Sequence, residues 1–593
     1  MTNELSIPES SRLSKWLRIA TSTTPGNWSE SSAAKWSKSL IHDCVNSHRH
    51  AEENFRPKRL IDIQSRGSIK LVKSEEVEPP PLTYATLSYC WGSEIDSQAQ
   101  LKTDSEEAEA RLSLGFDEGR IPTVVRDAVE VARGLSIPYL WVDAICIRQD
   151  KDCTGGDWEE HAGVMHRIYG NSQVTIAATS STSCREGFLY PNADDGPSLY
   201  LNYRSTLRPG NTGLLQMTVD SLRLENDGGL DILEIVGNST EIDTAKGVMF
   251  KMSKWSTRGW TFQEHVASTR LLAFGRRGKL SFSCPGLCQY HGTRQYDGGV
   301  VYLPFTGQHG LRWIFRRDVT DPWETLVAEY SERSRGFSYD GDIFPALSGL
   351  ARSYANATNK RETDYIAGFW RLSLTNDLLW FSLNSFRDKP LSHTDLLTTN
   401  RFSQRYICPS WSWIYCGAFQ PLLPRNMRYS VRSELQQIDA HIVLAGKDPF
   451  GAISAAELRI VGRMARVSSS HRIMKKVGDG QSERPPSEAQ AWFLKIKERR
   501  DWLFYLDWEP REAVTECPGI YMLLMATFKD YVSDAHNKRS LIGLLLLKVG
   551  VPSDGTSTGK EKFRRVGVFR SLPAQSPVSG RSFFGENEVV EIV

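Results

Sequence analysis

The chain has no long hydrophobic run. Its longest apolar stretch, Leu541–Leu547, ends at Lys548, whereas a membrane-spanning helix needs about 20 mostly apolar residues. The first residues, Met1–Ser11, are polar and acidic and lack the apolar segment of a secretory signal peptide. We therefore predict an intracellular, cytoplasmic protein without a membrane span.

The chain also lacks an excess of charge of either sign and is poor in cysteine. Its 72 basic and 70 acidic side chains leave a formal net charge of +2. No basic arm stands out, so we predict no nucleic-acid partner. Ten cysteines are scattered over 593 residues, which fits reduced thiols better than a disulfide framework.

Two groups of cysteine and histidine have metal-like spacing but too few ligands for tetrahedral zinc. The groups are Cys44 with His48 and His50, and Cys284 with Cys288 and His291. The sequence patterns of phosphate loops, zinc proteases, serine hydrolases and kinases are absent. We therefore predict no metal site and no resident cofactor.

The length of the chain indicates two or more domains, because one compact core rarely serves 593 residues. We expect an N-terminal extension at residues 1–80 and an α/β domain at 81–285 with an insertion at about 185–255. Residues 286–593 should form a mixed α+β region, in which helical stretches give way to short β runs beyond Ser430.

The α/β assignment depends on the alternation of strands and helices within residues 81–285. Strands are predicted at Tyr84–Tyr89, Tyr139–Ile145, Gln173–Ala178, Arg270–Phe274 and Leu280–Ser283, with helices at Val124–Leu135 and Trp158–Tyr169. Helical crossovers between the first three strands predict that they lie side by side and parallel.

Three segments are dense in aromatic residues: Leu82–Gly92, Tyr139–Asp150 and Arg258–Glu264. Together, in this order, they resemble the motifs of the fungal heterokaryon-incompatibility (HET) domain. The Trp-rich segments after residue 286 resemble the region that follows HET domains in many fungal proteins. The resemblance implies an effector of self/non-self recognition that leads to programmed cell death.

The order of four segments also resembles that of TIR domains. These segments are Leu87–Tyr89, Val142–Asp143, Val174–Ser180 and Trp260–Glu264, with a Gly155-Gly156 loop after the second. The resemblance implies a flavodoxin-like parallel sheet and NAD(P)+ as substrate, with Glu264 as the catalytic residue of NAD(P)+ cleavage. Two features differ from TIR domains: Thr261 stands in place of a cysteine, and an insertion of about seventy residues precedes the helix.

The position of Glu264 is itself suggestive. Trp260 and Glu264 are four residues apart and share one face of a predicted helix, and ligands of α/β sheets bind beyond the carboxyl ends of the strands. A carboxylate there could stabilise the oxocarbenium character that develops when the nicotinamide–ribose bond breaks. Alternatively, a glutamate early in a helix merely complements the helix dipole.

The candidate binding residues follow the predicted strands: Ser88, Tyr89, Cys90, Trp91 and Gly92, with Asp143, Arg258 and Trp260. The aromatic rings could stack on a base or nicotinamide, while Arg258 and backbone N–H groups at the first strand end could meet a phosphate. The structural alternatives are core packing for the aromatics, an Asx cap for Asp143 and a surface ion pair for Arg258. We expect the first strand end, Asp143 and Glu264 to converge on one surface.

The sequence leaves three functions open. The first is NAD(P)+ glycohydrolase activity centred on Glu264. The second is a non-enzymatic signalling module that assembles with itself through the HET domain or with an unknown incompatibility partner. The third is a degenerate paralogue without activity. Catalysis requires an ionised Glu264 carboxylate in a cleft, whereas assembly requires only packing, so a buried and salt-bridged Glu264 would favour assembly.

Overall fold

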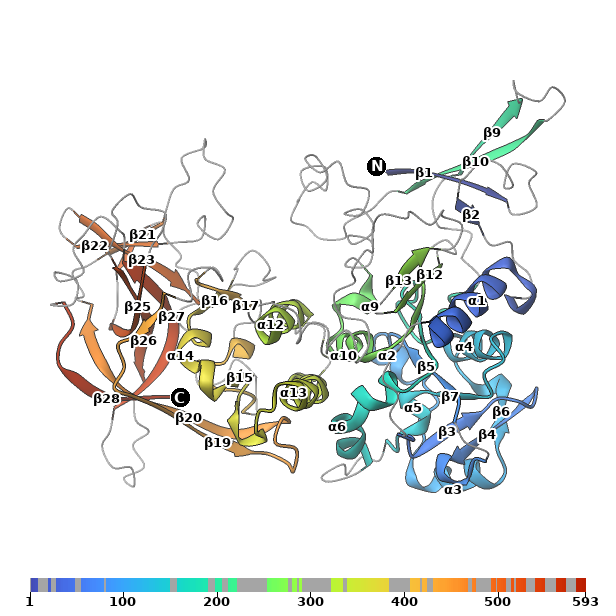
Figure 1. The fold of residues 1–593 in the computed structure, drawn as a ribbon, viewed down its shortest axis with the longest axis horizontal. Coiled ribbons are helices and arrows are strands. Elements are labelled where there is room, and N and C mark those ends of the chain that lie inside the picture. The colour runs from blue at the N-terminus through green and yellow to red at the C-terminus, as the bar shows by residue number, and fades with distance from the viewer. Residues whose placement is uncertain are drawn as a thin grey trace. The chain divides into compact units, whose positions relative to one another are not determined.

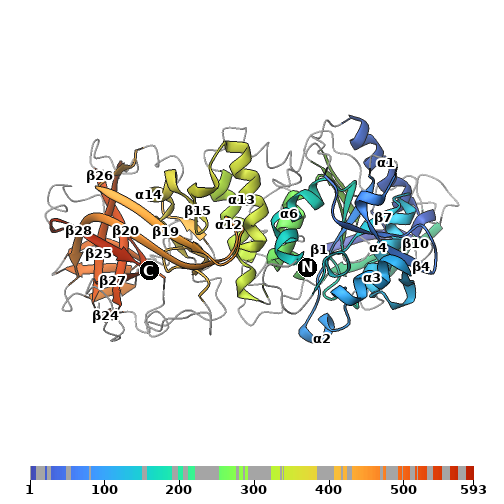
Figure 2. The same cartoon turned by 90° about the horizontal axis from the view of Figure 1, so that it is seen from below.

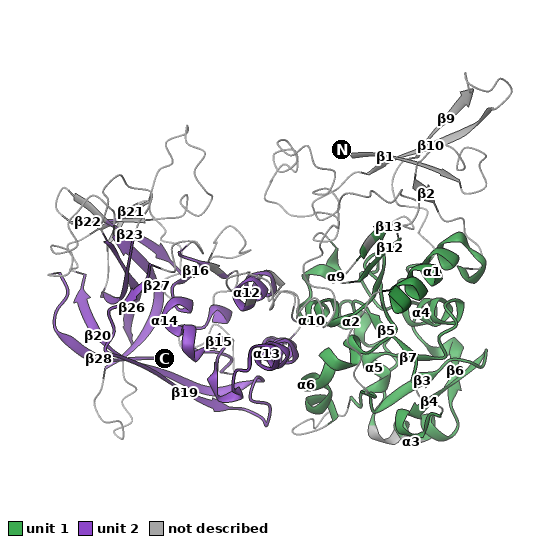
Figure 3. Ribbon diagram, in the orientation of Figure 1, with its two compact units in different colours: residues 1–317 green, residues 318–593 purple. Residues whose placement is uncertain are grey.

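The structure is a computed structural model of the 593-residue chain. It describes residues 2–8, 20–22, 28–47, 55–78, 82–149, 157–189, 198–204, 212–220, 253–275, 280–284, 287–290, 322–333, 337, 339–382, 406–415, 419–423, 430–467, 472–475, 492–496, 499–507, 514–516, 519–529, 539–549, 561–571 and 583–593. The chain forms two compact units, Met1–Arg317 and Asp318–Val593 (Figure 3). The domain boundaries at residues 80 and 285 remain predictions.

Unit 1 is built on a mixed sheet of nine described strands. In spatial order these are β13 (Leu287–Tyr290), β12 (Leu280–Cys284), β11 (Leu271–Phe274), β8 (Val174–Ala177), β5 (Tyr84–Ser88), β7 (Tyr139–Trp141), β3 (Arg59–Asp62), β4 (Ser68–Lys73) and β6 (Phe116–Asp117). The four central strands β11, β8, β5 and β7 are parallel to one another. Their parallel arrangement and the α/β class are confirmed, while antiparallel strands at both edges make the sheet mixed.

Burial explains why the central strands are apolar on both faces. Every residue of β5 and β8 is buried, as expected for strands covered by helices on each side. The covering helices are α1 (Ser32–Ser47) and α4 (Thr123–Gly134) on one face, and α6 (Asp157–Gly170) and α10 (Gly259–Ala267) on the other (Figures 1 and 2). The periodic residues of the two predicted helices form the inner faces of α4 and α6.

Strand β7 is shorter than the sequence predicts. A strand was expected over Tyr139–Ile145, but β7 ends at Trp141 and a short helix, α5 (Asp143–Cys146), follows. The cause is local: Oδ1 of Asp143 accepts the N–H of Ala144 at 2.7 Å, and the N–H of Cys146 donates to the Val142 carbonyl at 2.7 Å. The expected strand over residues 143–145 is therefore wrong.

The crossover from β5 to β7 contains more than a helix. Before α4 it holds α2 (Glu94–Ser97), α3 (Ser105–Ser113), β6 and the 3-10 helix η4 (Glu118–Arg120). Strands β3 and β4, which the sequence places in an N-terminal extension, belong to the central sheet. A separate four-stranded sheet combines β1 (Thr2–Pro8), β2 (Ala20–Ser22), β9 (Ser198–Arg204) and β10 (Thr212–Asp220).

Unit 2 is a mixed α+β region, as expected. Its longer helices are α12 (Pro322–Arg333) and α13 (Pro345–Thr358), which precede the β runs predicted beyond Ser430. Eleven described strands, from β18 (Arg432–Ser433) to β28 (Asn587–Ile592), form one largely antiparallel sheet that includes the long strands β20 (Ile453–Arg466), β25 (Ile520–Lys529), β26 (Arg539–Val549) and β27 (Lys562–Ser571). Buried tryptophans, including Trp370, Trp411 and Trp413, fill its core.

Two expectations from the composition concern the state of the cysteines and the absence of a membrane span. Six cysteines in these ranges are buried free thiols: Cys44, Cys90, Cys146, Cys184, Cys284 and Cys408. Among the helices that the structure describes, none combines the length and apolar character needed for a membrane crossing.

Thr175 offers a test of the sheet core. Its buried hydroxyl lies 2.8 Å from Oγ1 of Thr86 on β5 and 2.6 Å from Oγ of Ser268. Thr175→Val keeps the shape but removes this partner, so it should lower the free energy of unfolding by about 1–3 kcal/mol. Thr175→Ser, which keeps the hydroxyl, should cost less. Denaturant unfolding measures both, and a smaller loss for valine than for serine would contradict the network.

Candidate functional site

Glu264 lies in the second turn of α10, with its side chain directed at the carboxyl end of β5. The residue is 5% exposed, and its Oε2 accepts a hydrogen bond from the hydroxyl of Ser88, the last residue of the strand. The same hydroxyl accepts from Nε1 of Trp255 at 2.8 Å. Trp255 and Ser88 thus form a chain of donors that ends on the carboxyl group.

A second hydroxyl contacts the same carboxyl group. The hydroxyl oxygen of Tyr169 on α6 lies beside Glu264 and helps to lower its pKa, while the hydroxyl hydrogen is donated to the Leu87 carbonyl at 3.0 Å. Burial raises the pKa of Glu264 to about 8, and the nearby charge of Asp143 adds to the rise, against the hydrogen bonds and Arg258, which lower it. Glu264 is therefore mostly protonated at neutral pH in the free protein.

Asp143 is the second carboxyl group of the site and is partly exposed. Its Oδ2 accepts from Nε1 of Trp91 at 2.9 Å, and its Oδ1 accepts from the N–H of Ala144 at 2.7 Å. Burial raises its pKa, while these hydrogen bonds and Arg258 act in the opposite direction. Because Asp143 starts from a lower ordinary pKa and accepts from two donors, while its charge raises the pKa of Glu264, Glu264 is the member of the pair that holds the proton.

The structure brings the predicted site residues together at the ends of β5 and β7 and the start of α10. Those with buried side chains are Ser88, Tyr89, Cys90 and Glu264, and those partly exposed are Trp91, Gly92, Asp143, Arg258 and Trp260. Arg258 influences the pKa values of both carboxyl groups. The ring of Trp260 packs edge-on against that of Trp158, with centroids 5.8 Å apart. Each assigned binding role remains a prediction.

Two of these residues have structural tasks. Burial raises the pKa of the Cys90 thiol to about 11, so it is a neutral thiol at neutral pH. Gly92 has φ +96°, and a Cβ there would lie 2.6 Å from the Cβ atoms of Asp96 and Ser183. The turn also uses its own donors, since the Ser93 N–H is bonded to the Asp96 carboxylate at 3.2 Å. A carboxylate in this turn disfavours a phosphate there.

Two residues that contact the site, Trp255 and Tyr169, were not singled out from the sequence, and neither was Gln263, which precedes Glu264 on α10. Tyr169 has the spacing of an ordinary core residue, so only tertiary structure gives its role. Gln263 is fully buried, and neither its Oε1 nor its Nε2 has a hydrogen-bond partner among the described residues. A buried amide without partners costs free energy. In the sequence, the one signal for Gln263 is that it directly precedes Glu264.

The candidate metal groups gain no support from the geometry. Within the described part of the chain, no three His, Cys, Asp or Glu side chains are grouped to hold a metal ion. Cys44 instead accepts from Nε of Arg270 at 3.2 Å. His48, His50 and His291 lie outside the described residues, as does the Gly155-Gly156 loop.

The comparison with protein families agrees with the aromatic motifs. Residues 84–264 match the family model described as Heterokaryon incompatibility protein (HET), so the HET domain predicted from the three segments is confirmed over this range. The match associates the chain with heterokaryon incompatibility in general terms. No curated protein and no solved structure gives a match.

Because Glu264 is protonated at neutral pH, we predict that the stability of the protein depends on pH. Because its folded-state pKa is raised, its favourable contribution is complete below the ordinary pKa of about 4.5 and is lost as pH rises through about 8. Glu264→Gln mimics the protonated form, so its free energy of unfolding relative to wild type should rise by roughly 3–4 kcal/mol between pH 5 and 8.

The measurement is denaturant unfolding at several pH values. The matched control is Glu75→Gln, at an exposed glutamate of the same unit. A Glu264→Gln variant whose stability relative to wild type stays constant across this pH range would refute the raised pKa.

Proposed function

We propose that the HET domain cleaves the nicotinamide–ribose bond of NAD(P)+, and that loss of this cofactor kills fungal cells after contact between unlike partners. The observation that carries the proposal is the carboxyl group of Glu264, which is buried and protonated yet held against the carboxyl end of β5. Strongly perturbed carboxyl groups of this kind are typical of functional sites.

The strand order adds a second argument. In chain order the parallel strands β5, β7, β8 and β11 are first to fourth, and in space they lie in the order second, first, third, fourth. This is the order of flavodoxin-like sheets, whose ligands bind beyond the carboxyl ends of the first and third strands. Ser88 is the last residue of that first strand, so the carboxyl group lies beside the expected ligand position.

The proposed reaction uses the ionised form of Glu264. A bound nicotinamide ring is cationic, and an opposite charge a few ångströms away favours an ionised carboxylate. The bond between ribose C1′ and the nicotinamide nitrogen then breaks, and its electron pair goes to the nitrogen. The carboxylate stabilises the positive charge that develops on the ribosyl group. Water adds to C1′ and releases a proton, which leaves nicotinamide and ADP-ribose or its 2′-phosphate.

Neighbouring side chains have suitable chemistry for holding the substrate. Asp143 is partly exposed and could accept hydrogen bonds from ribose hydroxyls, while the partly exposed rings of Trp91 and Trp260 could stack on aromatic rings. Gln263 has an unbonded donor and acceptor among the described residues, as a carboxamide-binding group requires.

A non-enzymatic assembly module is the second candidate. The observation in its favour is also burial, since Glu264 is 5% exposed and has two hydroxyl partners. No salt bridge of Glu264 is present among the described residues, so only half of the arrangement expected for assembly is met. In this alternative, Glu264 would serve only to fix α10 against β5.

Glu264→Gln separates the two candidates. For wild type, kcat/KM for NAD+ should rise with pH toward about 8, because the ionised carboxylate is the active form. The variant should lose about 100-fold or more in kcat, with little change in KM and no such pH dependence. Nicotinamide release at matched folded concentration is the measurement, with cell death on overexpression as a parallel assay.

The contrary outcomes are specific. Undiminished NAD+ cleavage by the Glu264→Gln variant would remove Glu264 from the reaction. Cell death caused by wild type without loss of NAD(P)+ would reject the enzymatic proposal and favour assembly.

Gln263→Met tests the buried amide. If the amide serves the substrate, the variant should keep or raise the melting temperature, because an unbonded polar group is replaced by an apolar one. KM for NAD+ should then increase several-fold. A lowered melting temperature with unchanged KM would instead give Gln263 a purely structural role.

A further inference from the structure

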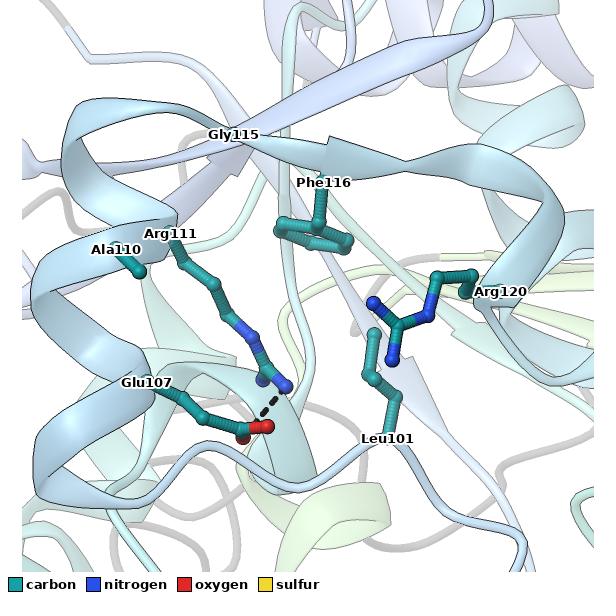
Figure 4. A pocket seen from close by; sticks show the side chains of 7 residues that line it. All are labelled: Leu101, Glu107, Ala110, Arg111, Gly115, Phe116 and Arg120. Carbon is teal, nitrogen blue, oxygen red and sulfur yellow. Dashed lines mark hydrogen bonds and ion pairs between the residues drawn. The ribbon is translucent and has the colours of Figure 1, made fainter.

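Unit 1 contains a cavity of about 150 Å³ away from the site around Glu264. It is built by the segment that precedes α4 in the crossover from β5 to β7. Its lining residues include Leu101, Glu107, Ala110, Arg111, Phe116 and Arg120 (Figure 4). One helix, α4, is enough to connect β5 to β7. The segment that forms the walls of the cavity is therefore an addition to the doubly wound sheet.

Arg111 forms one side of the cavity and is already paired. Its side chain leaves α3 and is almost completely buried. Nη2 donates to Oε2 of Glu107 at 2.7 Å, and Nη1 donates to Oγ1 of Thr103. The ring of Phe116 lies 5.5 Å from the guanidinium carbon. Glu107 therefore balances the charge of Arg111, and the rest of this wall is apolar.

Arg120 approaches the cavity from the opposite side. It is the last residue of η4, and its guanidinium points toward that of Arg111 across the space between Leu101 and Phe116 (Figure 4). Among the side chains that the structure describes, no ion pair or hydrogen bond neutralises it. The side chains that line the cavity, two arginines and one glutamate, carry a surplus of one positive charge. Burial lowers the pKa of Arg111 and the charge of Arg120 adds to this, while Glu107 and Asp104 act in the opposite direction.

We propose that this cavity binds a small organic monoanion, with one carboxylate on an apolar body. The carboxylate would lie between the two guanidinium groups, because planar guanidinium matches carboxylate geometry. The apolar body would pack against Leu101, Ala110 and Phe116. A single negative charge matches the surplus of the walls, whereas a phosphate dianion would place further charge against apolar surface at a desolvation cost.

The site is independent of the proposed NAD(P)+ cleavage. None of its lining residues belongs to the group around Glu264. The segment around Leu101 nevertheless connects the two places. Gln100 accepts from the Tyr89 hydroxyl at 3.2 Å, Nζ of Lys102 lies 5.1 Å from the ring centroid of Trp91, and the Thr103 N–H donates to the carbonyl of Ala144 at 3.1 Å. Binding can therefore be measured whether or not the protein is an enzyme.

Benzoate is the probe, and benzamide is its neutral counterpart of similar size. Calorimetric or ligand-observed NMR titration of the full chain should give a Kd near or below about 1 mM for benzoate, with much weaker binding of benzamide. Arg120→Gln should weaken benzoate binding by about tenfold or more, because it removes a charge-assisted hydrogen bond. Arg120 is exposed, so folding should be retained, and a thermal melt verifies it.

The matched control is Arg66→Gln, which removes the same charge from an exposed position between β3 and β4 and should leave the affinity unchanged. Three outcomes would overturn the proposal. These are no benzoate binding in the millimolar range, equal binding of benzamide, or equal loss of affinity in the Arg120 and Arg66 variants. Inorganic phosphate that competes as well as benzoate would also reject the monoanion assignment.

Discussion

The parallel pairing of β5 with both β7 and β8 is the constraint on which unit 1 depends. A strand with a parallel neighbour on each side can be reached only through crossovers, and right-handed crossovers in opposite directions place their helices on opposite faces. The arrangement explains why β5 is buried throughout and why α4 and α6 lie on different sides of the sheet. It also makes the end of β5 a meeting point for segments distant in sequence, and Ser88 occupies that point.

A layer of hydroxyl groups joins the sheet to α10. Thr86, Thr175 and Ser268 are linked in series, and Oγ of Ser268 also donates to the Glu264 carbonyl at 2.6 Å. Buried networks of this kind are favourable only when every member is satisfied, and they then hold their elements in one arrangement. The same dry surroundings raise the pKa of the nearby carboxyl group. Positioning of the helix and perturbation of Glu264 thus have one cause, which is the exclusion of water.

Much of this arrangement could be predicted from residue patterns, and the rest depends on tertiary contacts. Buried apolar runs and helical spacing identify β5, β8, α4 and α6, because both follow from burial. The end of β7 was missed, because Ala144 and Ile145 are as apolar as a strand while the turn at Asp143 is made by local hydrogen bonds. The aromatic motifs identify the segments of the site but not the Tyr169 contact, since hydrogen-bond partners on separate helices have no spacing rule.

The hydrogen bond between Ser88 and Glu264 spans 176 positions of the chain. Roughly 75 of these lie between the end of β8 and the start of α9 (Lys254–Thr257). The entropy of closing a flexible loop grows only with the logarithm of its length, so doubling such a loop costs about 0.6 kcal/mol. This connection is more than a loop, because β9 and β10 within it pair with each other, and β10 also pairs with β1 in the separate sheet. The contact between Ser88 and Glu264 therefore joins two parts of the central sheet domain between which the chain builds a second sheet.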